Sequence, residues 1–479
     1  MIPRLILLSL CVTQLAFAGR ADALFDLKEI RDAGNLETRV IEDWRPHPNI
    51  PEIQQKLVEI TVAEWWPGQK VRVPVTLNAP ADPAQLPCRN VVVANMPLGL
   101  RVSTPSGPAL QLLRENGVGV VQVGMGTIDA MVPEGQLHLG MKEQLLQTKN
   151  PRFSTAWIWG MSQMRGLTAA ESESEYFKPE KVISTGGSKR GIATSVAGIH
   201  DDRFTGIMPV VAPPLGNPSM PVDILGTEPA WIEGQDRRFL ETVDPGIRRS
   251  LGLRKLRRVS TRLTLEEVRA EGWSEKDIMS ISGRLWNTSR ITRHLDAVRD
   301  RGLEFFYNAG TNDSVTPALL ELGRKYPEFP IYIVPGGQHG GPGDAGYTRR
   351  VTVQPGVVQN FDSFCRHHFF GERSLPETPE IKAVKIGERI VVTTHFQNGA
   401  RPEQNELSWS FNRHQPYSLP FEYDRWQSVE MLHSGNNRWQ AEIPLPDNAM
   451  SIQFVSTHVD RENDIPFSIS SPLKEMQLR

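Results

Sequence analysis

The chain has 479 residues, of which 39% are hydrophobic and 23% are charged, and its formal net charge at pH 7 is -2. This composition excludes a largely disordered chain, and it gives no reason to expect nucleic acid as a partner. The length favours two or three domains with a large core.

The first eighteen residues have the pattern of a secretory signal peptide. A short basic start at 1–4 is followed by the apolar run LILLSLCVTQLAFA, which ends in the small-residue pattern Ala16-Phe17-Ala18. A lipoprotein signal would use Cys11, but the bulky Leu10 precedes it. We expect cleavage after Ala18 or nearby. The mature protein is then exported to the periplasm or secreted, and has no transmembrane segment.

Residues 24–56 form a helix-poor lead-in, and 58–80 give two β-rich runs around a Pro-Gly hairpin signal. From 90 to 212, short β-branched runs such as NVVVANMP alternate with helical stretches such as SGPALQLLREN. Continuous apolar strands separated by helices predict a mainly parallel sheet with helices on both faces.

Residues 214–295 do not continue this alternation of strands and helices. They contain charged helical segments and few candidates for buried strands. The sheet pattern resumes at 303–310 and 329–337. We therefore predict an α/β domain over 19–374 with a cap inserted at about 214–295. The stretch from Asp236 to Arg262 contains nine basic residues against three acids, which suits anionic substrates or a lipid headgroup surface, although a solvated helical face explains them as well.

After 375 the sequence changes to short β-rich segments separated by turns, such as ERIVVTTHF and SIQFVSTHV. This spacing predicts a small antiparallel β-sandwich of immunoglobulin-like type over 375–479. After signal cleavage, Cys88 and Cys365 are the remaining cysteines. Export permits a disulfide between them, and two buried free thiols are an equal alternative.

The stretch ISTGGSKRG, residues 183–191, runs from a predicted strand into a glycine-rich turn and then a helix. A nucleophile elbow needs this context, because a sharp strand-to-helix turn lifts its serine clear of the sheet. Ser188 has Gly186 two residues before it. Arg190 stands at the position of the second glycine in the usual G-x-S-x-G pattern, and Gly191 comes one residue later.

Two further polar residues follow predicted strands. Asp313 comes after FFYNAG, and His339 comes after IYIVPGGQ. The order Ser188, Asp313, His339 is that of α/β-hydrolases. Each of the three follows the carboxyl end of a predicted strand, which is where parallel sheets carry their active sites.

These residues predict an acyl-transfer site that needs no cofactor and no metal. His339 serves as general base, Asp313 orients its imidazole, and the backbone N–H of Lys189 donates to the oxyanion. We expect the second oxyanion donor after the strand VVVAN, at Leu98 or a neighbour.

Each member also has a structural explanation. Asp313 suits the cap of a following helix, and His339 suits a surface loop. Two other acids, Asp201 and Asp202, are expected to cap a helix or pair with Arg203. Asp362 is expected to face solvent from the final helix. The pair His367-His368 does not predict a metal site, because adjacent helical residues do not share a face and no ligand cluster completes the set.

Residues 182–214 resemble the PhoPQ-activated pathogenicity-related protein family. The elbow GGSKRG, the pair Asp202-Arg203 and Pro209 carry the resemblance, and AGTNDSVTP and VPGGQH are similar to the acid and histidine segments of that family. The elbow also resembles that of glucuronoyl esterases, in which an arginine and a late glycine follow the serine. The resemblance implies an α/β-hydrolase with an appended β-sandwich and leaves the substrate open.

The sequence therefore favours an exported serine hydrolase that cleaves an ester of a small molecule or glycan. A peptidase or amidase acting on peptides is the closest alternative. A second alternative is a non-catalytic, virulence-associated binding protein of the cell envelope on a hydrolase scaffold.

Overall fold

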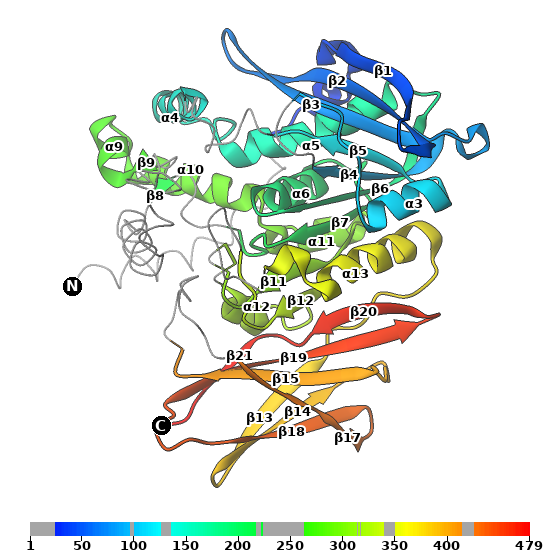
Figure 1. Ribbon diagram of the computed structural model, residues 1–479. Coiled ribbons are helices and arrows are strands. Elements are labelled where there is room, and N and C mark those ends of the chain that lie inside the picture. Colours follow the sequence, from blue (N-terminus) through cyan, green and yellow to red (C-terminus); the bar gives the residue numbers. More distant parts are fainter. Residues whose placement is uncertain are drawn as a thin grey trace, which may run out of the picture.

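The computed structural model describes residues 24–95, 100–125, 136–216, 222–223, 263–313, 315–316, 318–339, 350–413 and 426–479. A ten-stranded sheet forms the centre of the larger part of the molecule (Figure 1). Its strands are β1 (Arg39–His47), β2 (Ile50–Trp66), β3 (Gln69–Pro80), β4 (Cys88–Asn95), β5 (Gly119–Val123), β6 (Phe177–Gly187), β7 (Gly206–Val210), β10 (Glu304–Phe305), β11 (Tyr307–Gly310) and β12 (Ile331–Val334).

The strand order is β1-β2-β3-β5-β4-β6-β7-β11-β12, with β10 paired to β7. Strand β3 is antiparallel to both β2 and β5, whereas β5, β4, β6, β7, β11 and β12 are mutually parallel. One antiparallel strand followed by the exchange of β4 and β5 is the topology of the α/β-hydrolase fold. The fold predicted from the alternating strands and helices is confirmed.

Helices cover both faces of the sheet because its parallel strands bury both faces. Val91 and Val93 of β4 lie in one apolar cluster with the helix α5, whereas Val92 lies in another with the helix α13. The helices are α2 (Leu27–Arg31), α3 (Pro108–Asn116), α4 (Gln136–Thr148), α5 (Thr155–Glu171), α6 (Lys189–His200), α9 (Leu265–Ala270), α10 (Glu275–Thr288), α11 (Leu295–Asp300), α12 (Leu319–Lys325) and α13 (Pro355–Cys365). A π-helical turn, η7 (Arg366–Phe370), extends α13.

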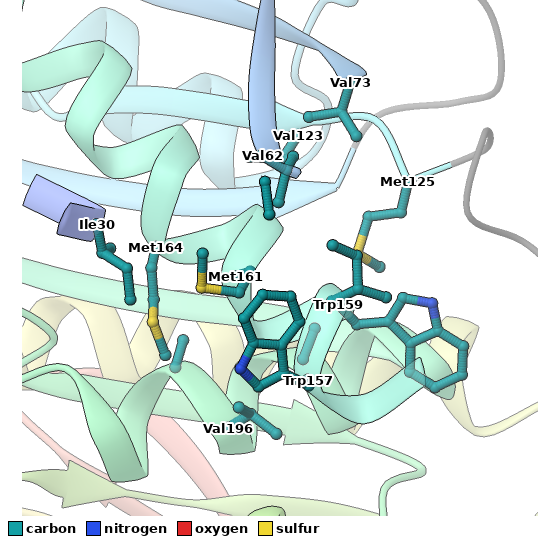
Figure 2. Packing of buried hydrophobic residues seen from close by; sticks show 14 of the residues in the cluster. Ile30, Val62, Val73, Val123, Met125, Trp157, Trp159, Met161, Met164 and Val196 are labelled. Carbon is teal, nitrogen blue, oxygen red and sulfur yellow. The ribbon is translucent and has the colours of Figure 1, made fainter. Parts of the chain in front are cut away.

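Helix α5 is apolar on nearly all sides, as a buried helix must be. Figure 2 shows Trp157, Met161 and Met164 of this helix packed between Val62 on β2 and Val196 on α6. This packing fixes α6, whose first turn follows Ser188, against the sheet.

The lead-in at 24–56, predicted to be poor in helix, contains several regular elements. Its residues form the short α2, the 3-10 turn η2 (Ala33–Leu36), the edge strand β1 and the start of β2. The described part of the predicted cap contains the strand pair β8 (Val222–Asp223) and β9 (Leu263–Thr264), the helices α9 and α10, and the turn η5 (Ile291–Arg293). The basic run 237–262 lies outside the described residues.

Two antiparallel sheets follow η7, and the boundary predicted near 375 falls just before the first of their strands. One sheet has the order β13-β14-β18-β17, and the other has β16-β15-β19-β20 with β21 paired to β19. The strands are β13 (Glu380–Ile386), β14 (Arg389–His395), β15 (Gln404–Phe411), β16 (Gln427–Glu430), β17 (Leu432–Gly435), β18 (Arg438–Pro444), β19 (Ser451–Glu462), β20 (Ile465–Ser470) and β21 (Lys474–Gln477).

The two sheets face each other as a β-sandwich, hereafter the C-terminal sandwich. Val392 and Trp439 of the first sheet share an apolar cluster with Leu407 and Phe454 of the second. The Oγ1 atom of Thr394 donates to Oγ of Ser456 across the gap, over 3.1 Å. In Figure 1 the sandwich lies against the end of the central sheet that carries β12.

Candidate active site

Ser188 stands alone between strand β6, which ends at Gly187, and helix α6, which begins at Lys189. Its backbone has φ 60° and ψ −130°, a conformation that non-glycine residues rarely adopt. The Ser188 N–H donates to the carbonyl oxygen of Val210 on the neighbouring strand β7, over 3.0 Å. This bond fixes the turn to the sheet, and the chain reverses sharply at the serine as an elbow requires.

The glycines around Ser188 stand where the chain is most crowded. A Cβ atom on Gly186 would lie 2.3 Å from Nδ2 of Asn95 and 3.0 Å from Cβ of Arg190. A Cβ atom on Gly191 would lie 2.8 Å from the carbonyl oxygen of Val210. The chain therefore comes closest to β7 at residue 191 and not at residue 190. This explains why a glycine stands at 191, whereas an arginine can stand at 190.

His339 follows β12 and reaches both of the other predicted residues. Its Nε2 atom lies 2.8 Å from Oγ of Ser188, and its Nδ1 atom lies 3.0 Å from Oδ1 of Asp313. Asp313 follows β11 and is 2% exposed, and its Oδ1 also accepts the N–H of Val315 over 2.8 Å. The structure thus brings the three residues together in one hydrogen-bonded chain, although they are far apart in the sequence.

The two hydrogen bonds of His339 define a single consistent proton arrangement. A carboxylate accepts and does not donate, so Nδ1 of His339 carries the proton that it donates to Asp313. In the neutral imidazole, Nε2 then accepts from the hydroxyl of Ser188. A base in this tautomer is placed to remove the proton of Ser188.

The backbone N–H of Lys189 is the first in helix α6, and the first N–H groups of a helix have no acceptor within it. This group also lies at the positive end of the helix dipole, which favours a developing negative charge. Leu98, the other predicted oxyanion donor, lies outside the described residues.

Two polar residues beside the elbow were not singled out from the sequence. Asn95 ends β4, and its Nδ2 donates to the carbonyl oxygen of Thr185 over 3.3 Å. The fully buried Gln163 of α5 donates from Nε2 to Oδ1 of Asn95 over 3.2 Å. They tie the start of the segment after β4 to the elbow strand. In the sequence, the glutamine among the mostly apolar residues of this helix was the only hint of this contact.

The rival acids lie elsewhere. Asp201 caps the opposite end of α6 from Ser188, is fully buried, and pairs with Arg203 over 2.7 Å, as predicted. Asp202 pairs with Arg31 and not with the predicted Arg203. Asp362 is only partly exposed and pairs with Arg366 over 2.9 Å, so the expectation that it simply faces solvent is wrong.

His367 and His368, adjacent in the π-helical turn η7, both contact the carboxylate of Glu304. His367 Nε2 lies 3.1 Å from Oε1, and His368 Nδ1 lies 2.5 Å from Oε2. Within the described ranges, no three His, Cys, Asp or Glu side chains gather as a group that could hold a metal ion.

Cys88 and Cys365 are both buried and free, so the disulfide alternative is not realised. Burial raises the pKa of the Cys88 thiol to about 12 and raises the pKa of Cys365 well above its ordinary value, which keeps both thiols protonated and inert. Of the helices that the structure describes, none combines the length and the apolar character needed to cross a membrane.

The elbow and its surroundings also match a known family. Residues 143–220 match the model of the PhoPQ-activated pathogenicity-related protein family. This match covers α5, β6, Ser188, α6 and β7, and it confirms the resemblance over the segment that carries the elbow. No curated protein sequence matches the chain.

Several solved structures are distantly similar. The acetyl xylan esterase from Paenibacillus sp. R4 is 14% identical over 66% of this chain and 87% of its own, with a TM-score of 0.41. A glucuronoyl esterase from Solibacter usitatus is 16% identical over 39% of this chain and 58% of its own, with a TM-score of 0.28. A puromycin-hydrolyzing peptidase from Mycobacterium tuberculosis is 15% identical over 63% of this chain, with a TM-score of 0.33. The chain spans 38% of the length of that peptidase. The assignment of the fold rests on the strand order of the central sheet and not on these similarities.

Proposed function

We propose that the protein is a serine hydrolase that cleaves carboxylic esters, with Ser188 as nucleophile, His339 as general base and acid, and Asp313 as the residue that orients His339. The observation that carries this proposal is the pair of hydrogen bonds at 2.8 Å and 3.0 Å that links the three side chains at the elbow. The family match at 143–220 adds that the segment containing the elbow is similar to a known family.

In the proposed reaction, Oγ of Ser188 forms a bond to the carbonyl carbon of the ester while its proton passes to Nε2 of His339. The tetrahedral intermediate then breaks its bond to the alcohol oxygen, which leaves with the proton from His339. Water repeats the sequence on the acyl-enzyme and releases the acid. The Asp313 carboxylate stabilises the imidazolium in both halves.

The negative charge on the intermediate needs backbone donors. We propose the N–H of Lys189 as one of them, since it follows the nucleophile and starts α6, and the N–H of Leu98 as the other. The bonds of Asn95 to Thr185 and Gln163 support this second assignment, because they hold the end of β4 three residues before Leu98.

The experiment that tests the proposal is labelling of the folded protein with a fluorophosphonate, which reacts with activated serines. We expect wild type to label, and Ser188→Ala and His339→Ala to lose the label. Ser172→Ala serves as the control, because Ser172 caps the far end of α5 and should leave labelling unchanged. A folded wild type that never labels would contradict the proposal and favour a non-catalytic binding protein.

A panel of 4-nitrophenyl esters beside aminoacyl anilides then separates an esterase from a peptidase, with small-molecule, glycan-ester and peptide substrates to follow.

Export to the periplasm or medium, with contact between the cap and a membrane surface, is part of the same proposal. It predicts a mature N-terminus at Gly19, which N-terminal sequencing of the protein from its native host would check.

A further inference from the structure

The residues just before Asp313 join the acid and histidine loops of the proposed site. The hydroxyl of Thr311 accepts the N–H of Gly336 over 2.7 Å, and the N–H of Asn312 donates to the carbonyl oxygen of Gly337 over 2.9 Å. Thr311, Asn312 and Asp313 are all at least nine-tenths buried. The position of the Asp313 carboxylate therefore depends on how well this short segment is held.

The C-terminal sandwich reaches the same segment with two side chains. Arg413, two residues after β15, donates from Nη2 to the carbonyl oxygen of Thr311 over 3.0 Å and to Oδ1 of Asn312 over 3.3 Å. Trp426, just before β16, donates from its indole Nε1 to the same Oδ1 over 3.2 Å. Strands β15 and β16 pair with each other, with Trp409 opposite Gln427, so both contacts come from the same end of one strand pair.

Arg413 is itself held in place from within the sandwich. Its Nη1 donates to Oε1 of Gln453 on β19 over 3.0 Å, and Nε2 of Gln453 donates to Glu475 on β21 over 3.1 Å. Its guanidinium also lies 5.1 Å from the centre of the Trp426 ring, a cation–π contact. A planar guanidinium with several fixed partners holds a neighbour more rigidly than a single flexible donor does.

We propose that Arg413 and Trp426 are positioning residues for the hydrolysis proposed above, on which this inference rests. They fix the chain at Thr311 and Asn312, and thereby hold the next residue, Asp313, at 3.0 Å from Nδ1 of His339. Neither side chain acts on the substrate. They act by keeping Asp313, and through it His339, in position. Small displacements of His339 slow the reaction, because proton transfer needs aligned groups.

This inference gives the C-terminal sandwich a defined part in the site. Without it, the acid loop keeps its bonds to the histidine loop but loses the three bonds from Arg413 and Trp426. The expected outcome is a site that is assembled but loosely held, in which Ser188 reacts slowly.

The test compares Arg413→Met, Arg413→Lys and Trp426→Phe with wild type in the full chain. Methionine removes the guanidinium, and phenylalanine keeps the ring but removes the indole N–H. We expect Arg413→Met to slow fluorophosphonate labelling by about tenfold or more and Trp426→Phe to slow it less, with partial rescue in Arg413→Lys. Arg461→Met is the control, since Arg461 pairs with Glu403 on the surface of the same sandwich, and it should label as wild type does.

A second readout does not depend on turnover. The proton on Nδ1 of His339 that is shared with Asp313 should give a resonance at low field in the proton NMR spectrum. We expect Asp313→Ala to abolish it, Arg413→Met to broaden or abolish it, and Arg461→Met to leave it unchanged. Circular dichroism establishes that each variant is folded, and Trp426→Phe carries the test if Arg413→Met does not fold.

The outcomes separate the two proposals. Folded Arg413→Met and Trp426→Phe proteins with an unchanged resonance and an unchanged labelling rate would overturn the positioning role. A wild type that shows the resonance but never labels would contradict the hydrolase proposal instead, and the effect of Arg413→Met on the resonance would still decide the positioning role.

Discussion

The carbonyl oxygen of Val210 and the Cα of Gly191 approach so closely that a Cβ atom at 191 would lie 2.8 Å from that oxygen. The same carbonyl accepts the N–H of Ser188. One atom of β7 therefore both anchors the proposed nucleophile and sets the size limit for a residue three positions later.

We predict that Gly191→Ala lowers the free energy of unfolding by about 1–3 kcal/mol, because the added methyl group overpacks the junction of β7 and α6. It should also slow labelling of Ser188, because the elbow must shift to make room. Gly283→Ala is the matched control: Gly283 lies in α10 with no atom within 4 Å of its Cβ position, so alanine should stabilise the helix by up to about 1 kcal/mol. Urea unfolding of both variants measures the difference, and equal stabilities would contradict the crowding argument.

Asp313→Asn should slow ester hydrolysis at neutral pH by a factor on the order of 10⁴, the size of effect seen when a triad acid becomes an amide and the histidine adopts the wrong tautomer. Asp202→Asn should leave the rate unchanged, since Asp202 is 64% exposed and pairs with Arg31. Steady-state kinetics on one ester for both variants provides the measurement. If Asp313→Asn kept the rate of wild type, another group would have to orient His339.

The contacts between Glu304 and the two histidines of η7 predict how stability depends on pH. Burial raises the pKa of Glu304, but the bonds from His367 and His368 outweigh it and bring that pKa to about 2, below the usual 4.5. Burial lowers the pKa of His367, but its bonds to Glu304 and to the carbonyl of Arg373 outweigh it and raise that pKa above 6.5.

The two pKa shifts stabilise the fold over overlapping pH ranges, one bounded on the acid side and the other on the basic side. The depressed pKa of Glu304 stabilises the fold above pH 4.5, and this contribution is lost as the pH falls through about 2. The raised pKa of His367 stabilises the fold below pH 6.5, and this contribution is lost as the pH rises through its pKa in the folded protein. The stability difference between wild type and Glu304→Gln should therefore be largest between these limits.

Because the carboxylate of Glu304 is 38% exposed, solvent screening limits the difference to about 1 kcal/mol. Thermal unfolding of wild type and Glu304→Gln from pH 3 to 9 would measure it, with each pH value compared at equal ionic strength. A difference that does not change with pH would show that the contacts make no pH-dependent contribution.

Arg203→Met should destabilise the protein by about 3 kcal/mol or more, because it leaves the fully buried carboxylate of Asp201 with Arg31 as its remaining cation. Burial by itself raises the pKa of Asp201, and the bonds from Arg203 outweigh it and lower that pKa. Arg461→Met removes an exposed pair, which solvent screens, and should cost much less stability. Denaturant unfolding distinguishes the two variants, and equal losses would mean that Asp201 finds a substitute partner.

The sequence predicts much of this fold because its parallel strands are buried on both faces, which leaves continuous β-branched runs such as the one around Val92. Ser188, Asp313 and His339 could be selected because each follows such a run, and the carboxyl ends of parallel strands meet at one edge of the sheet. Their order along the chain added to this reasoning, because a serine, then an acid, then a histidine is the order found in α/β-hydrolases.

Other contacts leave no periodic signal. Arg165 lies in the apolar helix α5, where a single arginine suggests an exposed face, yet it is 3% exposed. Its guanidinium donates to carbonyl oxygens of Glu29, Ile30 and Asp32, in a lead-in that has no apolar repeat of its own. Likewise, Arg413 contacts Asn312 although they are 101 residues apart in the sequence. No local sequence pattern predicts a contact between two different sheets.

The edge-to-face contact between Phe306 and Phe467, with ring centres 4.6 Å apart, joins the central sheet to strand β20 of the C-terminal sandwich. Both rings belong to one continuous apolar cluster that also contains Phe364 and Val392. Heat should therefore melt the two halves together, as a single calorimetric peak whose van't Hoff and calorimetric enthalpies agree. A chain shortened before β13 would expose an apolar wall to water in place of that interface, so removing the sandwich should make the remaining hydrolase fold prone to aggregation.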